Sequence, residues 1–503
     1  MAKDNEASGR SATGMHASCT VTSAVIRGVE AIPVFVEVSV APGLPSFSIV
    51  GMADASVQES RERVRAALRS CGFTVPQQRI VVNLAPAGIR KTGAGFDLPI
   101  AIGILCATGQ IDRALAEDAL MVGELSLTGE ARPVAGTLAY AVCARNLDLR
   151  LASAPGGGAA VPVEGLERLC VRHLSDFRSG SLTAYAPGIE ASRRGQLPDY
   201  ADIPGNVAAK RALQIAAAGG HGVLLTGPAD SSAIALALRL PSIMPPLSEA
   251  EKMDAAIIHD VNGLPLDLIE RGVRPCRRPH CTTSLPGLLG GGSPLRPGEA
   301  SLAHNGVLVL EDVHDFDKRV LQALRQPHGS GEVVIARADG NVRMPTRFLL
   351  AATSLPCPCG HFGDKDEPCT CQTGQIETFR RRAIGPLVDR IEVFANVDAS
   401  IQGARKSSED MKSGVLAAQE FAQWRFSKEG APGRPLSASD LIEACGLSDE
   451  VDTYLQSIIQ TSCMRGRSLM RMLAVARTVA DMEQAERVEG LHLQEALALT
   501  QDR

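Results

Sequence analysis

Three short apolar runs in the middle of the chain constrain its fold more than any other feature. They have the length and composition of buried strands, and they lie at Gly222–Thr226, Gly306–Leu310 and Phe348–Ala352. A helix is predicted before the first run, at Ala208–Ala218, and a turn directly after it. Because helix, strand, turn and further apolar strands alternate in this way, the middle of the chain is predicted to form a parallel α/β sheet.

The segments on either side follow other patterns. Valines alternate at period two from Val34 to Val40, as in a half-buried strand, and a helix at Ser56–Ser70, a strand at Arg79–Leu84 and a buried helix at Asp97–Ala107 follow. After about residue 400 the pattern is helical. The predicted helices are Gly414–Phe426, Ala438–Cys445, Asp449–Thr461, Ser468–Met482 and His492–Leu499.

A chain of 503 residues is too long for a single core. The stretch 186–200 contains Pro and Gly and has no apolar period, so it is predicted to be a linker. The expected organisation is a disordered tail (1–17), a first α+β domain (18–185), the linker, a parallel-sheet module (201–397) and a helical domain (398–503).

Composition excludes some settings and leaves the partner open. The formal net charge of -5 gives no overall attraction to nucleic acid, so any contact with DNA would need local arginine clusters. The first residues lack the apolar segment of a secretion signal, and no run of 18 apolar residues follows. A cytoplasmic protein without membrane contact is therefore expected.

The turn after the first apolar strand has the place of a phosphate-binding loop but not its residues. Such a loop reads GxxxxGK[ST], in which Lys reaches the phosphates and the hydroxyl binds Mg²⁺. Here the sequence is Gly227-Pro228-Ala229-Asp230-Ser231-Ser232-Ala233-Ile234. Asp230 also adds a negative charge, which at about 4 Å and an effective dielectric of about 20 would repel a phosphate charge by roughly 4 kcal/mol.

Segments from the whole chain together resemble one family. They are GLPSFSIVG (43–51), ESRERVRAAL (59–68), VNLAPA (82–87), FDLPIAIGIL (96–105), VGELSLTGEARPVAG (122–136), KRALQIAAAGGH (210–221), PPLSEAE (245–251), GGGSPLRPGEASLAHNGVL (290–308), LRQPHGSGEVVIARA (324–338), PCPCG (356–360), GPLVDRIEV (385–393) and VARTVADME (475–483). In this order they resemble the ComM/YifB family of bacterial AAA+ proteins, which is related to the ATPase subunit of magnesium chelatase.

The resemblance implies a multidomain α/β fold and an activity. The fold would consist of an N-terminal domain like ribosomal protein S5 domain 2 and the Lon protease domain, an AAA+ P-loop-type module and a C-terminal helical lid. The family implies ATP and Mg²⁺ as cofactors, a homo- or hetero-oligomeric ring, and DNA as partner during branch migration in transformation.

The Lon-like domain also raises the hypothesis of a peptidase. Lon proteases use a Ser activated by a Lys. In KTGAGFDLP (91–99), Phe96 and Asp97 stand where the Ser would be needed, and VAGTLAYAVCARN (134–146) contains no Lys. Peptidase activity is therefore not expected.

The next two strands end in residues that also depart from the family. Glu311-Asp312 stands where the family has Asp-Glu, so the carboxylates that would hold Mg²⁺ and orient water are exchanged. Leu355 replaces the Asn expected at the end of the third strand, and its side chain cannot polarise a water molecule.

Two arginines stand at positions where the family has functional arginines. Arg390 resembles the arginine finger of the family and Arg467 its second sensor, and both would stabilise phosphate charge across a subunit boundary. The alternatives are an Asp389–Arg390 ion pair with a structural role, and a solvated Arg467 at the start of a helix.

Four cysteines stand apart from the scattered ones. Cys357 and Cys359 form one C-x-C pair, Cys369 and Cys371 a second, and His361 lies between them. They predict a structural Zn²⁺ site, and the alternative is a reduced loop without metal. Cys276 and Cys281, near His280, are a weaker pair for which unpaired thiols are preferred.

Local basic residues are the candidates for contact with DNA. They are Arg271, Arg274, Arg277, Arg278, Arg296 and Arg380 to Arg382. A charge run is more often a solvated face, and aromatic stacking partners are missing, so contact with DNA rests on the resemblance.

Four functions remain open. They are an active ATP-dependent DNA motor with an atypical loop, a chelatase-type ATPase subunit, a copy without a selected role, and a pseudo-ATPase or regulatory subunit whose carboxylates and arginines are vestigial in its own site. The loop from Gly227 to Ile234 favours the pseudo-ATPase, for which bound ATP and Mg²⁺ are doubtful.

Overall fold

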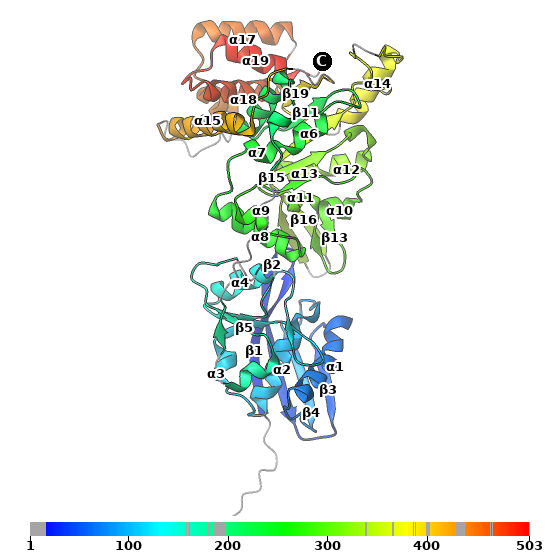
Figure 1. Ribbon diagram of the computed structural model, residues 1–503, viewed down its shortest axis with the longest axis vertical. Helices are drawn as coiled ribbons and strands as arrows, with labels where there is room; N and C mark the ends of the chain where they lie inside the picture. The colour runs from blue at the N-terminus through cyan, green and yellow to red at the C-terminus, as the bar shows by residue number, and fades with distance from the viewer. Residues whose placement is uncertain are drawn as a thin grey trace, which may run out of the picture.

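The computed structural model describes residues 17–156, 158, 161–179, 182–185, 197–337, 340–364, 367–385, 387, 389–398, 403–428, 438–462, 464 and 466–501. These residues form an elongated molecule, with the N-terminal domain at the bottom of Figure 1 and the C-terminal helices at its top. Within the described ranges, no helix is apolar over a length that would cross a membrane. Residues 1–16 of the expected tail and 186–196 of the expected linker lie outside them, and Ala17 already begins the first strand.

The N-terminal domain is built on an eight-stranded mixed sheet of order β10-β9-β8-β5-β1-β2-β4-β3. The strands of this sheet are β1 (Ala17–Arg27), β2 (Glu30–Ala41), β3 (Ser46–Val50), β4 (Arg79–Ala85), β5 (Ala119–Val122), β8 (Arg150–Ser153), β9 (Arg168–Cys170) and β10 (Thr183–Ala184). A separate two-stranded sheet consists of β6 (Glu124–Leu125) and β7 (Ala131–Arg132). The helices of this domain are α1 (Ala55–Ser70), α2 (Asp97–Ala107), α3 (Ala114–Glu117) and α4 (Thr137–Asn146). The predicted elements in this domain are confirmed.

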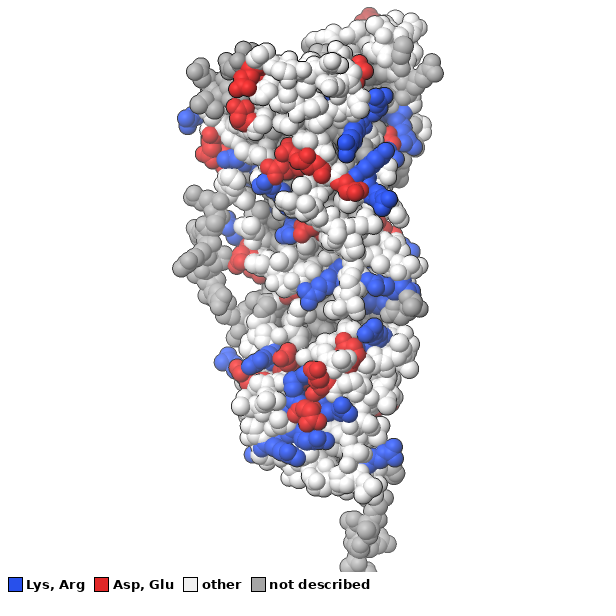
Figure 2. Space-filling model, turned by 90° about the vertical axis from the view of Figure 1, so that its right-hand side faces the viewer, with Lys and Arg blue, Asp and Glu red and all other residues white. Residues whose placement is uncertain are grey.

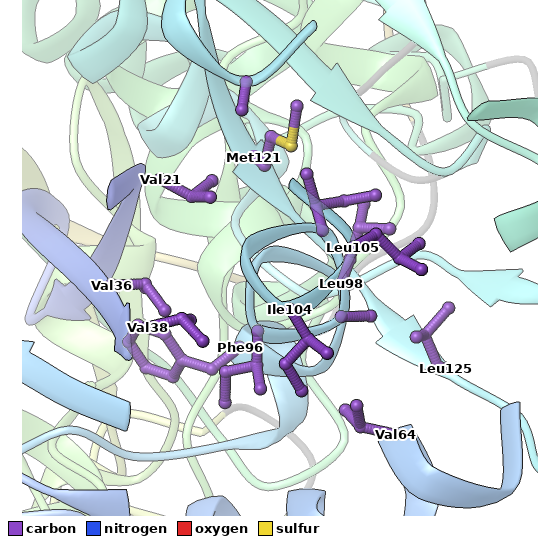
Figure 3. Close-up of a cluster of buried hydrophobic side chains, with 14 of the residues drawn as sticks. Val21, Val36, Val38, Val64, Phe96, Leu98, Ile104, Leu105, Met121 and Leu125 are labelled. Atoms are coloured by element: carbon purple, nitrogen blue, oxygen red, sulfur yellow. The ribbon is translucent and has the colours of Figure 1, made fainter. Parts of the chain in front are cut away.

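The core of this domain surrounds α2, whose residues are all buried. Figure 3 shows side chains from β1, β2, β5 and α1 gathered around this helix. The helix lies close to β2 because it carries Gly103, where a Cβ would come within 2.5 Å of Val38 Cγ2. Asp97, at the start of α2, is buried and accepts two hydrogen bonds from Arg63, at 2.6 and 2.9 Å. Asp97 thus holds α1 against α2.

The middle module contains a five-stranded parallel sheet of order β12-β15-β18-β11-β19. Its strands and those of two hairpins are β11 (Val223–Thr226), β12 (Cys276–Arg277), β13 (Gly290–Gly291), β14 (Arg296–Pro297), β15 (Gly306–Leu310), β16 (Glu332–Arg337), β17 (Gly340–Pro345), β18 (Phe348–Ser354) and β19 (Val393–Asn396). Its helices are α5 (Val207–Gly219), α6 (Ala233–Leu238), α7 (Leu240–Ile243), α8 (Glu249–Val261), α9 (Asp267–Glu270), α10 (Leu285–Leu289), α11 (Glu299–Leu302), α12 (Lys318–Ala323), α13 (Arg325–Ser330) and α14 (Thr373–Ile384).

Alternate side chains of the central strands point to two different cores. Val223 and Leu225 of β11 pack with α5, α6 and the C-terminal helices, whereas Leu224 packs with α10 and α12 on the other face. Both faces of the sheet are therefore covered, which explains why these strands are uniformly apolar in the sequence. The predicted parallel sheet is confirmed.

Five helices form the described part of the C-terminal domain. They are α15 (Ser408–Lys428), α16 (Ala438–Cys445), α17 (Asp449–Thr461), α18 (Arg467–Met482) and α19 (Gly490–Thr500). These helices confirm the helical prediction, although α15 begins six residues before the predicted Gly414. They share one core with α5 and β11, so this domain covers one face of the middle sheet.

The N-terminal domain meets the middle module where α4 packs against α8 (Figure 1). Asp260 of α8 is buried, and its carboxylate accepts hydrogen bonds from the N–H groups of Leu138 at 2.8 Å and Gly158 at 3.0 Å. Burial is the main cause that raises the pKa of Asp260. One carboxylate of the module thus binds backbone donors of the preceding domain.

Candidate functional site

The turn after β11 is where an AAA+ module would hold phosphates. The Gly227 N–H donates to the Ser354 carbonyl at 3.2 Å, and a Cβ on Gly227 would come within 2.6 Å of the Val397 carbonyl. The Ser231 N–H donates to the Pro228 carbonyl at 3.0 Å. This donor is therefore used inside the turn and is not available to a ligand.

The side chains of this turn fit a triphosphate poorly. Helix α6 begins at Ala233, which is buried, and Ile234 packs against the same core as β11. The motif requires an ammonium group and a hydroxyl at these two positions. Ser232 precedes the helix, and its side chain accepts no hydrogen bond from the first turn. Asp230 is exposed and supplies the only charge of the turn, which has the wrong sign for binding phosphate.

The first carboxylate after β15 is engaged by an arginine. Arg278 Nε donates to Glu311 Oε2 at 2.9 Å, and Arg278 Nη2 donates to the same oxygen. Arg278 follows β12, which is the parallel neighbour of β15, so the sheet itself places the guanidinium there. A positive charge thus lies against the carboxylate to which the family resemblance assigns Mg²⁺. The sequence singled out both residues but not their contact, because 33 positions separate them.

The second carboxylate and the end of β18 complete this edge of the sheet. Asp312 has a left-handed backbone (φ 49°), and its N–H donates to Thr353 Oγ1 at 3.0 Å. Burial is the main cause that raises the pKa of Asp312. Strand β18 continues to Ser354, two residues beyond the predicted end, and the Ser354 hydroxyl donates to the Leu355 carbonyl at 3.0 Å. Both hydroxyls at the strand end are therefore already engaged.

The two arginines singled out in the sequence, Arg390 and Arg467, lie close to each other and away from the turn after β11. Arg390 Nη2 donates to the Arg325 carbonyl at 2.8 Å, and Arg467, whose side chain is 84% exposed, forms an ion pair with Asp389 at 3.2 Å. Arg325 Nη2 lies 3.9 Å from the same Asp389 carboxylate. Among the described residues, Asp389 therefore pairs with Arg467 and Arg325 rather than with Arg390. We refer to Arg325, Asp389, Arg390 and Arg467 as the arginine cluster.

The arginine cluster lies at the opposite end of the sheet from the turn. A Cβ on Gly222, the residue before β11, would meet the Arg390 carbonyl at 2.0 Å, whereas Gly227 follows the same strand. Five residue steps at about 3.3 Å each separate the two ends by about 16 Å. The backbone of Arg390 therefore lies about one strand length from the turn.

The four cysteines of the two C-x-C pairs are brought together after β18. Their sulfur atoms all lie within 4.8 Å of one another, and three of the Sγ–Sγ distances are 3.4, 3.6 and 3.7 Å. Tetrahedral Zn²⁺ with Zn–S bonds of about 2.3 Å places its sulfurs about 3.8 Å apart. The residues therefore fit a four-thiolate Zn²⁺ site. His361 instead contacts Asp364 at 3.5 Å and Glu367 at 3.4 Å.

The remaining sequence candidates are mostly structural. Arg274, Arg277 and Arg278, three of the candidates for contact with DNA, form ion pairs with Glu251, Glu299 and Glu311, so their charges also hold loops in place. Arg380 Nε donates to the Pro356 carbonyl at 3.3 Å and ties α14 to the cysteine loop. Burial raises the pKa of Cys276 to about 11, as suits an inert thiol.

Comparisons with known proteins cover nearly all of the chain. Family models match in three consecutive parts: "Subunit ChlI of Mg-chelatase" at residues 36–155, "Magnesium chelatase, subunit ChlI" at 199–405, and "Magnesium chelatase, subunit ChlI C-terminal" at 405–500. The competence protein ComM of Haemophilus influenzae is 35% identical over 495 residues, covering 95% of this chain and 96% of its own. YifB of Escherichia coli is 35% identical over 484 residues, covering 94% of each chain.

Proposed function

Because this chain belongs to the magnesium chelatase ChlI-like family that includes ComM and YifB, we propose that it is a pseudo-ATPase protomer of that family. It keeps the AAA+ architecture and does not bind or hydrolyse ATP in its own site. It acts as a regulatory or scaffolding subunit in a ring, where it presents its arginine cluster to a competent neighbouring protomer.

The observation that carries this proposal is the charge at the carboxyl edge of the sheet. Asp230 places a negative charge where phosphates would lie, and Arg278 places a positive charge on Glu311, where Mg²⁺ would lie. Each charge has the opposite sign to the one that ATP and Mg²⁺ need. The family cofactors therefore do not fit the residues that are present.

The position of the arginine cluster supports the second half of the proposal. In AAA+ rings an arginine acts on the nucleotide of an adjacent subunit, so it must lie away from its own phosphate loop. The cluster satisfies this requirement, because it lies at the amino end of β19. Exposed Arg467 provides a charge that a neighbouring subunit could contact.

The names of the relatives support a wider setting for the proposed activity. One of them is named as a competence protein, and the family resemblance implies DNA as the partner. We therefore place the proposed ring on DNA during its processing. The four-cysteine cluster would hold one structural Zn²⁺, because a closed set of four thiolates leaves no position open for substrate.

Calorimetry with Mg·ATP tests the nucleotide part. The unmodified chain should give no binding heat at up to millimolar nucleotide. A loop-restored chain, carrying Asp230→Gly, Ser232→Gly, Ala233→Lys and Ile234→Thr, should bind in the micromolar range.

The matched control replaces Ala233→Lys by Ala233→Leu in the restored loop. Leucine adds a side chain of similar bulk without an ammonium group, so this variant should not bind. Micromolar binding and turnover by the unmodified chain would contradict the pseudo-ATPase and favour the motor with an atypical loop.

A further inference from the structure

A cavity of about 880 Å³ lies where the N-terminal domain meets the middle module. The N-terminal domain lines it with the turn after β1, the start of β2 and α4, and the module lines it with α8, the loop before β15 and the β16–β17 hairpin. Figure 1 shows α4 and α8 next to each other at this boundary. The volume is within the range of small-molecule sites, which is about 300–1,000 Å³. We refer to this feature as the interdomain cavity.

A buried histidine in the wall of this cavity carries a donor without an acceptor. His304, in the loop between α11 and β15, is only 1% exposed. The Arg347 N–H donates to His304 Nδ1 at 3.0 Å, so the proton of the neutral ring is on Nε2. Nε2 is buried and has no hydrogen-bond partner within the described part of the chain. A buried N–H group without an acceptor is destabilising, and an oxygen atom of a ligand would relieve that cost.

The ring of His304 stays neutral at pH 7, and a guanidinium lies near it. Burial, and after it the charge of Arg347, lowers the pKa of His304 to about 4. Arg347 is exposed, lines the same cavity and forms no ion pair with any described residue. Its stem packs on Gly331, where a Cβ would come within 3.0 Å of Arg347 Cγ. An N–H donor and a guanidinium in one cavity are groups that bind a carboxylate.

The cavity also holds carboxylates that lack an ionic partner. Asp254 of α8 and Glu30 of β2 line it, and neither forms an ion pair among the residues that the structure describes. Burial is the main cause that raises the pKa of Asp254. Elsewhere charges of opposite sign lie side by side, as Figure 2 shows for one face of the molecule, and within the cavity Arg343 pairs with Glu332 at 2.7 Å.

These charges select a ligand that carries both signs. A simple anion on Arg347 would be repelled by Asp254, whose charge is close enough to interact with that guanidinium. A ligand with a carboxylate and an ammonium group would instead find a partner for each. Aliphatic side chains of α4 and α8 form the rest of the wall, and the described lining contains no Phe, Tyr or Trp on which a base could stack.

We propose that the interdomain cavity binds a small zwitterion of the amino-acid or dipeptide class. Its carboxylate accepts hydrogen bonds from His304 Nε2 and from the Arg347 guanidinium. Its ammonium group lies against Asp254 and Glu30, and its aliphatic side chain contacts α4 and α8. The ligand therefore joins the two domains. The proposal goes beyond the proposed function and does not depend on it, because the cavity shares no residue with the turn after β11 or with the arginine cluster.

Scanning fluorimetry and calorimetry on the full chain, without nucleotide, test this proposal with leucine and leucylleucine as probes. At about 10 mM, at least one of them should raise the melting temperature by more than about 2 °C. The tighter of the two in calorimetry assigns the ligand to the amino acids or to the dipeptides. The amide of that probe lacks the carboxylate and its N-acetyl form lacks the ammonium group, so each should bind at least about tenfold more weakly.

Substitutions connect each group of the probe with its partner in the cavity. Arg347→Gln should remove the preference for the free carboxylate over the amide. Asp254→Asn with Glu30→Gln should remove the preference for the free amine over the N-acetyl form. His304→Asn keeps an oxygen that can accept the Arg347 N–H but lacks the Nε2–H donor, so the probe should bind about tenfold more weakly.

Arg343→Gln with Glu332→Gln is the matched control, because these side chains line the same cavity but pair with each other. This variant should bind within about twofold of the unmodified chain. If His304→Asn does not fold, the substitutions of the exposed Arg347, Asp254 and Glu30 decide the outcome.

Three results would overturn the proposal: no binding of either probe, an equal loss in the control, or unchanged preferences in the charge variants. Binding of Mg·ATP by the unmodified chain would contradict the proposed function alone.

Discussion

The two ends of the five-stranded sheet differ in what their charges can do. At the carboxyl end, Asp230 and the Arg278–Glu311 pair oppose the charges of ATP and Mg²⁺. At the amino end, the arginine cluster keeps exposed positive charge, in particular at Arg467. The same strands hold both ends in place, so under the proposed function the fold is retained while the carboxyl end loses its chemistry.

The difference follows from where each end would act. Under the proposed function, residues of the turn would act on a nucleotide bound to their own chain, whereas the arginines, about 16 Å away along the strand, would act on a neighbouring chain. A protomer that cannot bind nucleotide at its own turn can therefore still act through the arginine cluster at the amino end of its sheet. If the arginine cluster had no role in a neighbouring subunit, neither the carboxyl end nor the amino end of the sheet would contribute to ATP hydrolysis.

The largest effect is expected when a working phosphate loop and the arginine cluster are placed on two different chains, which are then mixed. One chain carries the restored loop together with Arg278→Ala, Glu311→Asp, Asp312→Glu and Leu355→Asn, but lacks the cluster through Arg390→Ala and Arg467→Ala. Mixed with the unmodified chain, it should hydrolyse ATP at least about 100-fold faster than either chain alone, because an arginine finger contributes about 10³ or more to the rate. Phosphate release measures this effect.

The control for this mixture is an otherwise unmodified chain with Arg390→Ala and Arg467→Ala, which should not stimulate. The restored chain with its own arginines serves as the positive reference. If that reference is active and the mixture only reaches the sum of its parts, the amino end is not functional either, and the comparison fails.

The four-cysteine cluster after β18 allows a test of whether the carboxyl end of the sheet keeps a structural metal site although it does not bind nucleotide. The purified chain should contain about one Zn²⁺, and Cys369→Ser with Cys371→Ser should remove it. If the metal contributes about 3 kcal/mol, the melting temperature should fall by about 6–12 °C. Cys281→Ser, outside the cluster, is the matched control and should change neither quantity. Protein that is free of metal and equally stable in both variants would refute the zinc site.

A smaller effect is expected from Arg278. In the loop-restored chain, Arg278→Ala should strengthen Mg·ATP binding about tenfold, which corresponds to about 1.4 kcal/mol, because it removes the charge that competes with Mg²⁺ at Glu311. Arg277→Ala is the control, since Arg277 pairs with Glu299 instead. Equal affinities in calorimetry would show that the guanidinium does not block the metal.

The smallest effect concerns stability. Arg467→Ala should change the free energy of unfolding by less than about 0.5 kcal/mol, because its ion pair with Asp389 is largely exposed. Arg390→Ala should cost about 1 kcal/mol, since its guanidinium is partly buried and donates to the Arg325 carbonyl. Urea titration measures both. A large loss for Arg467→Ala would assign that residue to the fold rather than to a neighbouring subunit.

The elements of the fold were predictable wherever one local pattern dominated. The helix Asp97–Ala107 and the strand Gly306–Leu310 have the predicted bounds, because burial on all sides makes every position except Asp97 apolar and polar residues lie at or next to their ends. The end of β18 was missed by two residues, since Thr353 and Ser354 have hydroxyl groups that engage backbone groups and look like a turn in the sequence. The absence of the Lys and of the hydroxyl from the turn could also be predicted from the sequence, because a phosphate loop is a contiguous motif.

Contacts between distant segments could not be predicted in this way. The sequence by itself determined which groups the carboxyl end lacks, since chemistry at Ala233 and Ile234 is a matter of residue type. Only the tertiary structure decided that Arg278 neutralises Glu311 and that Asp389 pairs with Arg325 and Arg467. The physical reason is that strand order and domain docking, which no local periodicity records, set the distances on which electrostatic interactions depend.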